Sequence, residues 1–176
     1  MTTYAALLRG VNLGARNRIG MAELRELVEG LGGEGVRTYV QSGNVVLRSR
    51  LTPAKLEQAL SESIRRALDL DVAVLVRTAA QLARLVVDGP FPKADPATLH
   101  VTFLAANPDT ERVHRLHGRD FRPDELRLAG DAAYLHCPNG YGRSKLSNAF
   151  IEKQLDVVAT TRNWTTVTAL AELTAG

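Results

Sequence analysis

The run Gly140-Tyr141-Gly142-Arg143-Ser144-Lys145 sets two basic side chains among glycines, directly before an apolar segment with helical spacing. This pattern predicts a helix over residues 144–155 whose first backbone N–H groups are free to bind an anion. Arg143 and Lys145 would add positive charge, so the predicted chemistry is recognition of a phosphate or a carboxylate. The alternative is that the glycines shape a turn, Ser144 caps the helix and both basic groups are solvated.

A second candidate is the segment at residues 10–20, which is rich in glycine and asparagine and is therefore predicted to be a long loop. Arg9, Asn12, Arg16 and Arg18 supply guanidinium and amide donors there. The segment lacks the Gly-Lys-Ser/Thr ending of a P-loop, so no nucleotide class is predicted from it. A solvated, mobile loop is the alternative.

Other polar residues give weaker signals. Arg162, just before Trp164, is a further candidate contact for an anion. His114 and His117 lie one helical turn apart, but zinc needs more ligands and none is suitably spaced, so no metal and no cofactor are predicted. The full candidate set for anion binding is Arg9, Asn12, Arg16, Arg18, Gly142, Arg143, Ser144, Lys145, Asn148 and Arg162.

The charge of the chain is unevenly distributed, although its net value is only +3. Acidic residues are absent from residues 1–22, 35–56 and 132–151, and each of these stretches contains basic residues. If the three stretches meet in space, they form one positive surface that favours an anionic ligand.

The elements that must position these residues follow a repeated order, β-α-β-β-α. Alternation of β-prone runs, helical periodicity and turn residues predicts two ferredoxin-like lobes of an α+β fold. The first lobe should occupy residues 1–87, a proline-rich linker residues 88–97, and the second lobe residues 98–176 with a C-terminal helix. The first lobe has strands predicted at residues 4–9, 36–41, 44–48 and 72–76, whereas the second lacks an obvious closing strand.

The predicted strands are continuously apolar rather than alternating, as residues 5–8 and 72–76 show. Both sheet faces should therefore be covered, by the other lobe or by another subunit of a homodimer. Few aromatic residues fall in these strands, which argues against an RNA-binding protein that stacks bases on an open sheet.

Three strings of the sequence stand out. They are the opening Tyr4-Ala5-Ala6-Leu7-Leu8-Arg9-Gly10-Val11-Asn12-Leu13-Gly14, the turn Gln41-Ser42-Gly43-Asn44-Val45, and the run from Tyr141 to Asn148 that continues to Trp164. These strings resemble a family of small bacterial proteins known as domain of unknown function 1697. The resemblance implies a two-lobe α+β build, but it carries no activity, substrate or cofactor. Thr165 and Ala169 depart from the asparagine and lysine typical of the family.

The composition indicates a protein of a reducing compartment. Cys137 is the only cysteine, and no targeting or membrane-spanning segment is evident, so a cytoplasmic location is expected. The leading hypothesis is a binding module for an anionic ligand, either a phosphorylated small molecule or a nucleic-acid backbone. One alternative is an enzyme with Arg143, Lys145 and Asn148 as transition-state donors, and another is an assembly protein without a ligand.

Overall fold

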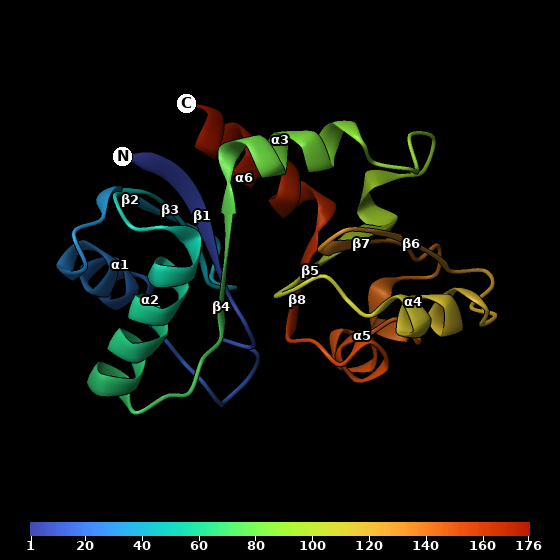
Figure 1. Cartoon of the computed structure of the whole chain (residues 1–176), viewed down its shortest axis with the longest axis horizontal. Coiled ribbons are helices and arrows are strands. Elements are labelled where there is room, and N and C mark those ends of the chain that lie inside the picture. Colours follow the sequence, from blue (N-terminus) through green and yellow to red (C-terminus); the bar gives the residue numbers. More distant parts are fainter. The chain divides into compact units, whose positions relative to one another are not determined.

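The computed structural model describes residues 1–176 and divides the chain into two compact units. Unit 1 comprises Met1–Val86 together with Thr168–Gly176, and unit 2 comprises Val87–Val167. The sequence had placed the whole last helix with the second lobe, whereas these units divide that helix at Thr168. Figure 1 shows the helices and strands of both units.

Unit 1 contains a four-stranded antiparallel sheet in the order β2-β3-β1-β4. Two helices, α1 and α2, cover one face of this sheet, and α3 follows its last strand (Figure 1). The elements are β1 (Thr2–Leu8), α1 (Met21–Gly30), β2 (Glu34–Tyr39), β3 (Asn44–Ser49), α2 (Pro53–Leu68), β4 (Val74–Thr78) and α3 (Ala79–Val87).

Unit 2 repeats this arrangement with the sheet order β6-β7-β5-β8, so the prediction of an α+β fold with two ferredoxin-like lobes is confirmed. Helices α4 and α5 lie on one face of the sheet. The elements are β5 (Leu99–Leu104), α4 (Thr110–His117), β6 (Glu125–Ala129), β7 (Ala132–His136), α5 (Asn148–Leu155), β8 (Ala159–Asn163) and the first turn of α6 (Trp164–Ala175), with short 3-10 turns at Pro96–Thr98 and Tyr141–Arg143.

The helix α2 shows how sequence dictates local structure. Thr52 caps it by accepting a hydrogen bond from the Lys55 backbone N–H at 3.4 Å, and Pro53 occupies the first turn, where no N–H is required. Leu56, Leu60 and Ile64 recur at helical spacing and are all buried against the sheet.

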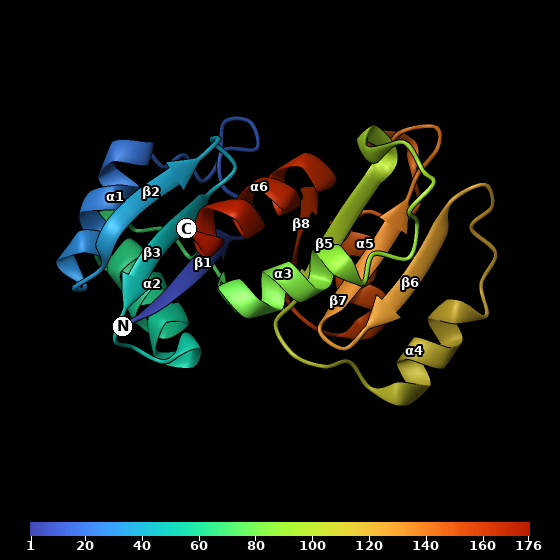
Figure 2. The ribbon, with the colours of Figure 1, turned by 90° about the horizontal axis from the view of Figure 1, so that it is seen from above.

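Both faces of the unit 1 sheet are buried, as the apolar strands predicted. Ala6 and Leu8 face the helices, whereas Leu7 and Leu75 are equally buried on the other face. Part of that second face is covered by Thr168–Gly176, the C-terminal end of α6, which lies beside β1 and β3 (Figure 2). The Arg37 guanidinium ties this segment to β2 by donating from Nη2 to the Leu173 carbonyl oxygen at 3.1 Å.

The second sheet does have a closing strand, contrary to the prediction from the sequence. β8 pairs with β5 from Leu104↔Ala159 to His100↔Asn163, and the Thr102 and Thr161 hydroxyls lie 2.8 Å apart between these strands. The strand was not predicted because its sequence, Ala-Thr-Thr-Arg-Asn, contains one apolar residue and so carries no strand periodicity.

Candidate functional site

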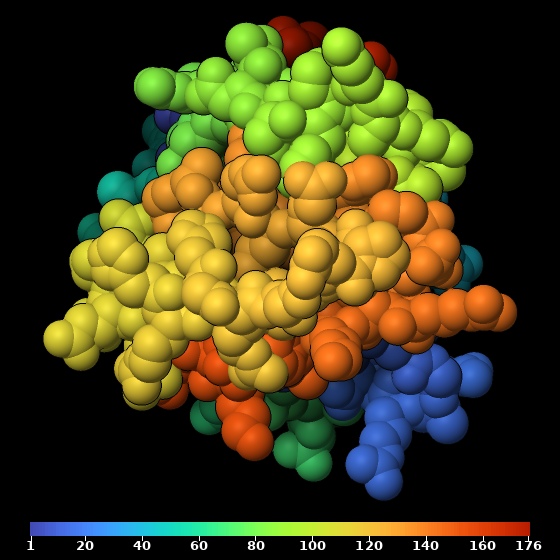
Figure 3. Space-filling view, turned by 90° about the vertical axis from the view of Figure 1, so that its right-hand side faces the viewer, coloured from blue at the N-terminus to red at the C-terminus, as the bar shows by residue number.

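A polar hollow of about 410 Å³ lies in unit 2, between the loop that precedes β6 and the loop that follows β7. Figure 3 shows the face of unit 2 formed by α4 in yellow and by the following loop and hairpin in amber to orange, with the surface hollowed among them. The residues that give the hollow its chemistry are Asp120, Arg122, Asp124, Asn139, Arg143 and Lys145.

The first wall is a loop held in shape by an aspartate. Asp120 accepts hydrogen bonds from the Arg122 backbone N–H at 3.0 Å and from Arg122 Nε and Nη2 at 2.9 and 2.7 Å. This two-pronged contact matches the fork of the guanidinium to the carboxylate and closes a tight turn. The loop therefore presents Arg122 and Asp124 in fixed positions along the rim.

The second wall is the glycine-containing turn singled out from the sequence. Gly140 has a φ of +96°, a conformation that side chains disfavour, and its N–H donates to the Cys137 carbonyl oxygen. The Tyr141 ring stacks on His100 of β5 with 4.4 Å between ring centroids. This contact anchors the short turn that carries Arg143. Burial lowers the pKa of His100, so the stacked imidazole is neutral near pH 7.

A chain of hydrogen bonds links the two walls. The Ser144 hydroxyl donates to Asp124 Oδ2 at 2.7 Å, and the Leu146 backbone N–H donates to Ser144 Oγ at 3.0 Å. Each donor satisfies the next acceptor, so the orientation of the Asp124 carboxylate is set from the far wall.

The charges in the hollow are partly compensated. Arg122 lowers the pKa of Asp120 chiefly through the side-chain hydrogen bond, with smaller contributions from its backbone N–H and from the charge of Lys145. In return, Asp120 raises the pKa of Arg122. The exposed side chains of Arg143 and Lys145 form no salt bridge, so their positive charges are available to a ligand.

Two of the predicted ligand residues, Arg143 and Lys145, line this hollow. Ser144 lies behind it as the partner of Asp124, and Gly142 shapes the turn. The predicted helix start is wrong: α5 begins at Asn148 and is capped by Ser147, whose hydroxyl accepts from the Phe150 N–H at 3.2 Å. The helix N-terminus therefore does not adjoin Arg143 in sequence as expected, because Ser144 bonds to Asp124 instead of capping.

Asn148 and Arg162 have structural partners. Asn148 Nδ2 donates to the Ala159 carbonyl oxygen at 3.0 Å, and its Oδ1 accepts from the Thr161 hydroxyl at 3.0 Å, which ties α5 to β8. Arg162 is buried in β8, where its Nη1 donates to Thr160 Oγ1 at 2.6 Å and to the Thr161 carbonyl oxygen. Desolvation lowers the pKa of Arg162 to about 10.

The basic loop of the first lobe, at residues 10–20, lies in unit 1. Asn12 organises it: its Nδ2 donates to the carbonyl oxygens of Ile19 at 3.0 Å and Gln41 at 2.7 Å, and its Oδ1 accepts from the Ile19 N–H. Arg16 is exposed, and Arg18 Nε donates to the Gly14 carbonyl oxygen. The backbone N–H of Arg9 donates to the Ala73 carbonyl oxygen. Convergence of this loop with Arg143 and Lys145 stays a prediction.

Asp120, Arg122, Asp124 and Asn139 line the hollow but were not predicted from the sequence. Residues 109–127 mix both charge signs, a composition typical of a solvated segment. The only available signal was their proximity to a proline and an exposed turn, which is common in ordinary loops.

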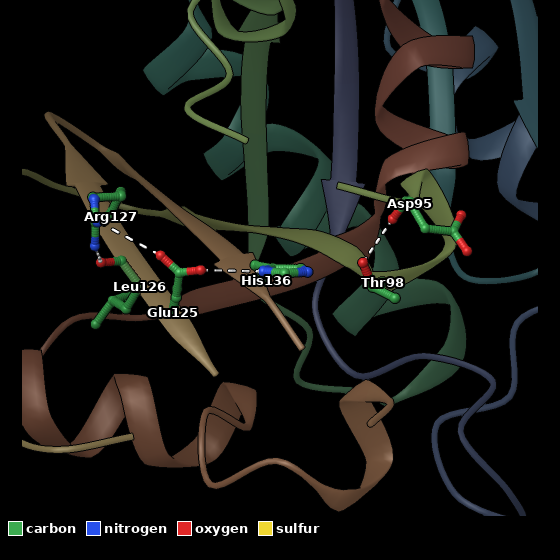
Figure 4. A network of polar contacts seen from close by, with 6 residues as sticks. All are labelled: Asp95, Thr98, Glu125, Leu126, Arg127 and His136. Carbon is green, nitrogen blue, oxygen red and sulfur yellow. Dashed lines mark hydrogen bonds and ion pairs between the residues drawn. The ribbon is translucent and has the colours of Figure 1, made fainter. Parts of the chain in front are cut away.

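A second polar cluster lies on the β6–β7 hairpin (Figure 4). The Glu125 carboxylate lies 3.4 Å from His136 Nδ1 and 3.6 Å from Arg127 Nη2. Phe91 of the proline-rich segment packs against His136 and lies under the Arg127 guanidinium, and the Thr98 hydroxyl donates to the Asp95 carbonyl oxygen at 2.6 Å. The cluster thus holds the proline-rich segment against the edge of the sheet.

Two sequence patterns gain no support as ligand sites. Gly30-Leu31-Gly32-Gly33-Glu34-Gly35 has the spacing G-x-G-x-x-G, but it leads from helix α1 to strand β2, whereas dinucleotide binding requires the order strand to helix. No group of three His, Cys, Asp or Glu side chains is placed to hold a metal ion. No helix has the length and apolar character needed to cross a lipid bilayer.

Together, the two ferredoxin-like lobes define a small two-unit α+β protein with a polar hollow in its second unit. A family model described as protein of unknown function (DUF1697) matches residues 1–134, about three quarters of the chain. The chain belongs to this family. The matched range ends before the turn that carries Arg143 and Lys145.

A solved structure shares the fold. The conserved bacterial protein SP0830 from Streptococcus pneumoniae is similar with a TM-score of 0.80 over 98% of this chain and 98% of that chain, at 22% sequence identity. At this identity the likeness shows the fold alone. Comparison with curated proteins gives no significant match.

Proposed function

We propose that the protein binds a small phosphorylated molecule in the hollow of unit 2, with Arg143 and Lys145 as the residues that contact the phosphate. The proposal rests on which charged side chains of the hollow form salt bridges and which do not. Asp120 forms a salt bridge with Arg122, whereas Arg143 and Lys145 line the same hollow and form no salt bridge. Two cations without a salt bridge on one concave surface suit a doubly charged phosphate monoester.

The size of the site favours a small molecule over a nucleic-acid backbone. A volume of about 410 Å³ lies within the range of small-molecule pockets. A nucleic-acid interface needs many phosphate contacts spread along a surface, and two cations supply few. The buried, unpaired Cys137 is compatible with a reducing, cytoplasmic setting for such a ligand.

Isothermal titration calorimetry with inorganic phosphate and phosphate monoesters tests the proposal. We expect Arg143→Ala and Lys145→Ala each to weaken binding by about tenfold or more, because each removes a charge-assisted hydrogen bond. Arg115→Ala is the matched control, since Arg115 is an exposed arginine of α4 that does not line the hollow.

Three results would count against this function. The first is an absence of heat with every phosphate compound. The second is an equal loss in the Arg115→Ala control. The third is binding only to oligonucleotides, with affinity falling steeply as salt rises, which would indicate the nucleic-acid alternative.

A further inference from the structure

The hollow that offers two free cations also contains a carboxylate without a cationic partner. Asp124 lies among the lining residues together with Arg143 and Lys145, and its one side-chain hydrogen bond comes from Ser144. A site that bound only phosphate would gain from a neutral residue here, because a carboxylate repels the anion. Asp124 therefore suits a ligand that also donates hydrogen bonds.

We infer that the ligand is a phosphorylated sugar or polyol, whose hydroxyl groups donate to Asp124 and bind Asn139 while its phosphate contacts Arg143 and Lys145. This inference rests on the proposed function, because it names the chemical class of the uncharged part of the same ligand.

The position of Asp124 is set before any ligand arrives. The Leu146 N–H donates to Ser144 Oγ at 3.0 Å, and the Ser144 hydroxyl donates to Asp124 Oδ2 at 2.7 Å, which leaves Oδ1 without a hydrogen bond from the protein. An ionised carboxylate only accepts hydrogen bonds, so its natural partner is a hydroxyl or an amine. A carboxylate held in this way loses little side-chain entropy when a ligand binds.

Asp120, the other carboxylate in the hollow, does not compete for this role. Both of its oxygens accept from Arg122, at 2.9 and 2.7 Å, and the pair closes its own turn. Asp120 therefore shapes the wall, whereas Asp124 has one carboxylate oxygen that can accept a hydrogen bond from a ligand.

Two further lining residues suit a polyol. The exposed Asn139 side chain forms no hydrogen bond with the protein, and an amide both donates and accepts, as a hydroxyl does. Phe121 also lines the hollow and packs edge-on against Phe150 with centroids 5.8 Å apart. Its ring gives an apolar surface for the C–H groups of a sugar.

The test compares phosphate compounds that differ only in what the phosphate is attached to. The full chain is titrated by calorimetry with inorganic phosphate, phenyl phosphate, ribose 5-phosphate and glucose 6-phosphate. We expect at least one sugar phosphate to bind about tenfold more tightly than phenyl phosphate, because a hydrogen bond to a charged acceptor is worth that factor. Equal affinity for phenyl phosphate would overturn the inference and leave the proposed function standing, whereas no binding of any phosphate compound would remove both.

The variant Asp124→Asn gives opposite effects on the two parts of the ligand. Ser144 would hold the amide oxygen and leave the NH₂ group toward the ligand, so the sugar phosphate should lose its advantage over phenyl phosphate. Inorganic phosphate should bind equally well or more tightly, because one negative charge has been removed. Glu111→Gln, an exposed acidic residue of α4 outside the hollow, controls for the change in net charge.

A second variant keeps the inference testable if Asp124→Asn does not fold. Asn139→Ala removes a side chain without protein hydrogen bonds and should reduce the sugar-phosphate advantage about threefold, the value of one neutral hydrogen bond. Retention of the full advantage in both Asp124→Asn and Asn139→Ala would overturn the inference.

Discussion

Gly43 has a backbone conformation and surroundings that exclude a side chain. Its φ is +82°, and a Cβ atom there would lie 2.5 Å from Val11 Cγ2 and 2.8 Å from Leu8 Cβ. We expect Gly43→Ala to lower the free energy of unfolding by about 2–4 kcal/mol, because left-handed strain and overpacking add. Urea denaturation followed by circular dichroism measures this loss.

Gly14 is the matched control for Gly43. Its φ is +90°, but nothing lies within 4 Å of its missing Cβ atom. Gly14→Ala should therefore cost only the strain, about 1–2 kcal/mol. Equal losses of stability for the two variants would show that the close approach of the new methyl group to Leu8 and Val11 adds nothing to the cost of Gly43→Ala.

Asp120 has its pKa held below the ordinary value of an aspartate, first by the side-chain hydrogen bond from Arg122. Because the folded-state pKa is depressed, the contribution of this pair to stability is present at neutral pH. It is lost as the pH falls below the ordinary pKa and through the folded-state value. Both side chains are largely exposed, so this contribution is small.

We expect a ¹³C NMR titration of the aspartate carboxyl groups to show one low pKa, and Arg122→Ala to raise it toward the ordinary value. Lys145→Ala should raise it less, because the charge of Lys145 has a weaker influence on the pKa of Asp120 than Arg122 has. An Asp120 pKa that does not respond to Arg122→Ala would contradict the assigned cause.

At this scale the sequence predicted the cations of the hollow but not its carboxylates. Arg143 and Lys145 stood out because glycines flank them and no acidic residue is near in sequence. Asp124 meets Ser144 across 20 positions, a contact created by folding, and nothing in a loop of mixed charge distinguishes it from a solvated aspartate.

Among the elements, α5 is attached to β8 by hydrogen bonds of two side chains. One is Glu152, whose carboxylate accepts from the Ala159 backbone N–H at 2.9 Å, and the other is Asn148. Asn148 begins the helix, and its amide bonds to both Ala159 and Thr161 of the strand. We expect Asn148→Ala to lower the free energy of unfolding by about 1–3 kcal/mol, because it removes two partly buried hydrogen bonds, although the Thr161 hydroxyl keeps its contact with Thr102. Thermal denaturation monitored by circular dichroism measures the effect.

Asn139→Ala is the stability control, since the exposed Asn139 amide has no protein partner and its loss should change the free energy of unfolding by no more than about 0.5 kcal/mol. If Asn148→Ala lowers the free energy of unfolding no more than this control does, the hydrogen bonds from Asn148 to β8 do not contribute measurably to stability. If instead it leaves stability intact and abolishes phosphate binding, Asn148 is a ligand residue, as the sequence had suggested.

Element order and most helices could be predicted from the sequence, because periodicity and caps are local properties. The closing strand β8 and the start of α5 could not. β8 pairs with the edge of β5, and the Ser144 hydroxyl bonds to the distant Asp124, so that Ser147 caps α5 in its place. Both outcomes depend on neighbours that sequence spacing does not reveal.

For the whole molecule, the last residues of the chain form part of the core of unit 1. Leu170 is fully buried, and Leu173 receives a hydrogen bond from Arg37. We expect Leu170→Ala to cost about 2–5 kcal/mol, the usual range for a buried leucine. Leu13→Ala, at a leucine that is 76% exposed, should change stability by no more than about 0.5 kcal/mol.

Equilibrium denaturation in urea compares the free energies of unfolding of the two leucine variants. Equal losses would contradict the assignment of Thr168–Gly176 to the core.

The continuously apolar strands did predict that both sheet faces are covered. They could not identify the cover, because a segment about 90 residues after β4 supplies part of it.

The central claim is that the hollow of unit 2 binds phosphate through Arg143 and Lys145. Titration of ¹⁵N-labelled protein with inorganic phosphate, followed by two-dimensional NMR, tests it most directly because each backbone amide reports separately. We expect saturable shifts concentrated in residues 120–124 and 139–146, which should need about tenfold more phosphate or more in Arg143→Ala and be unchanged in Arg115→Ala. Saturable shifts confined to other parts of the chain, or no saturable shift at all, would contradict the account.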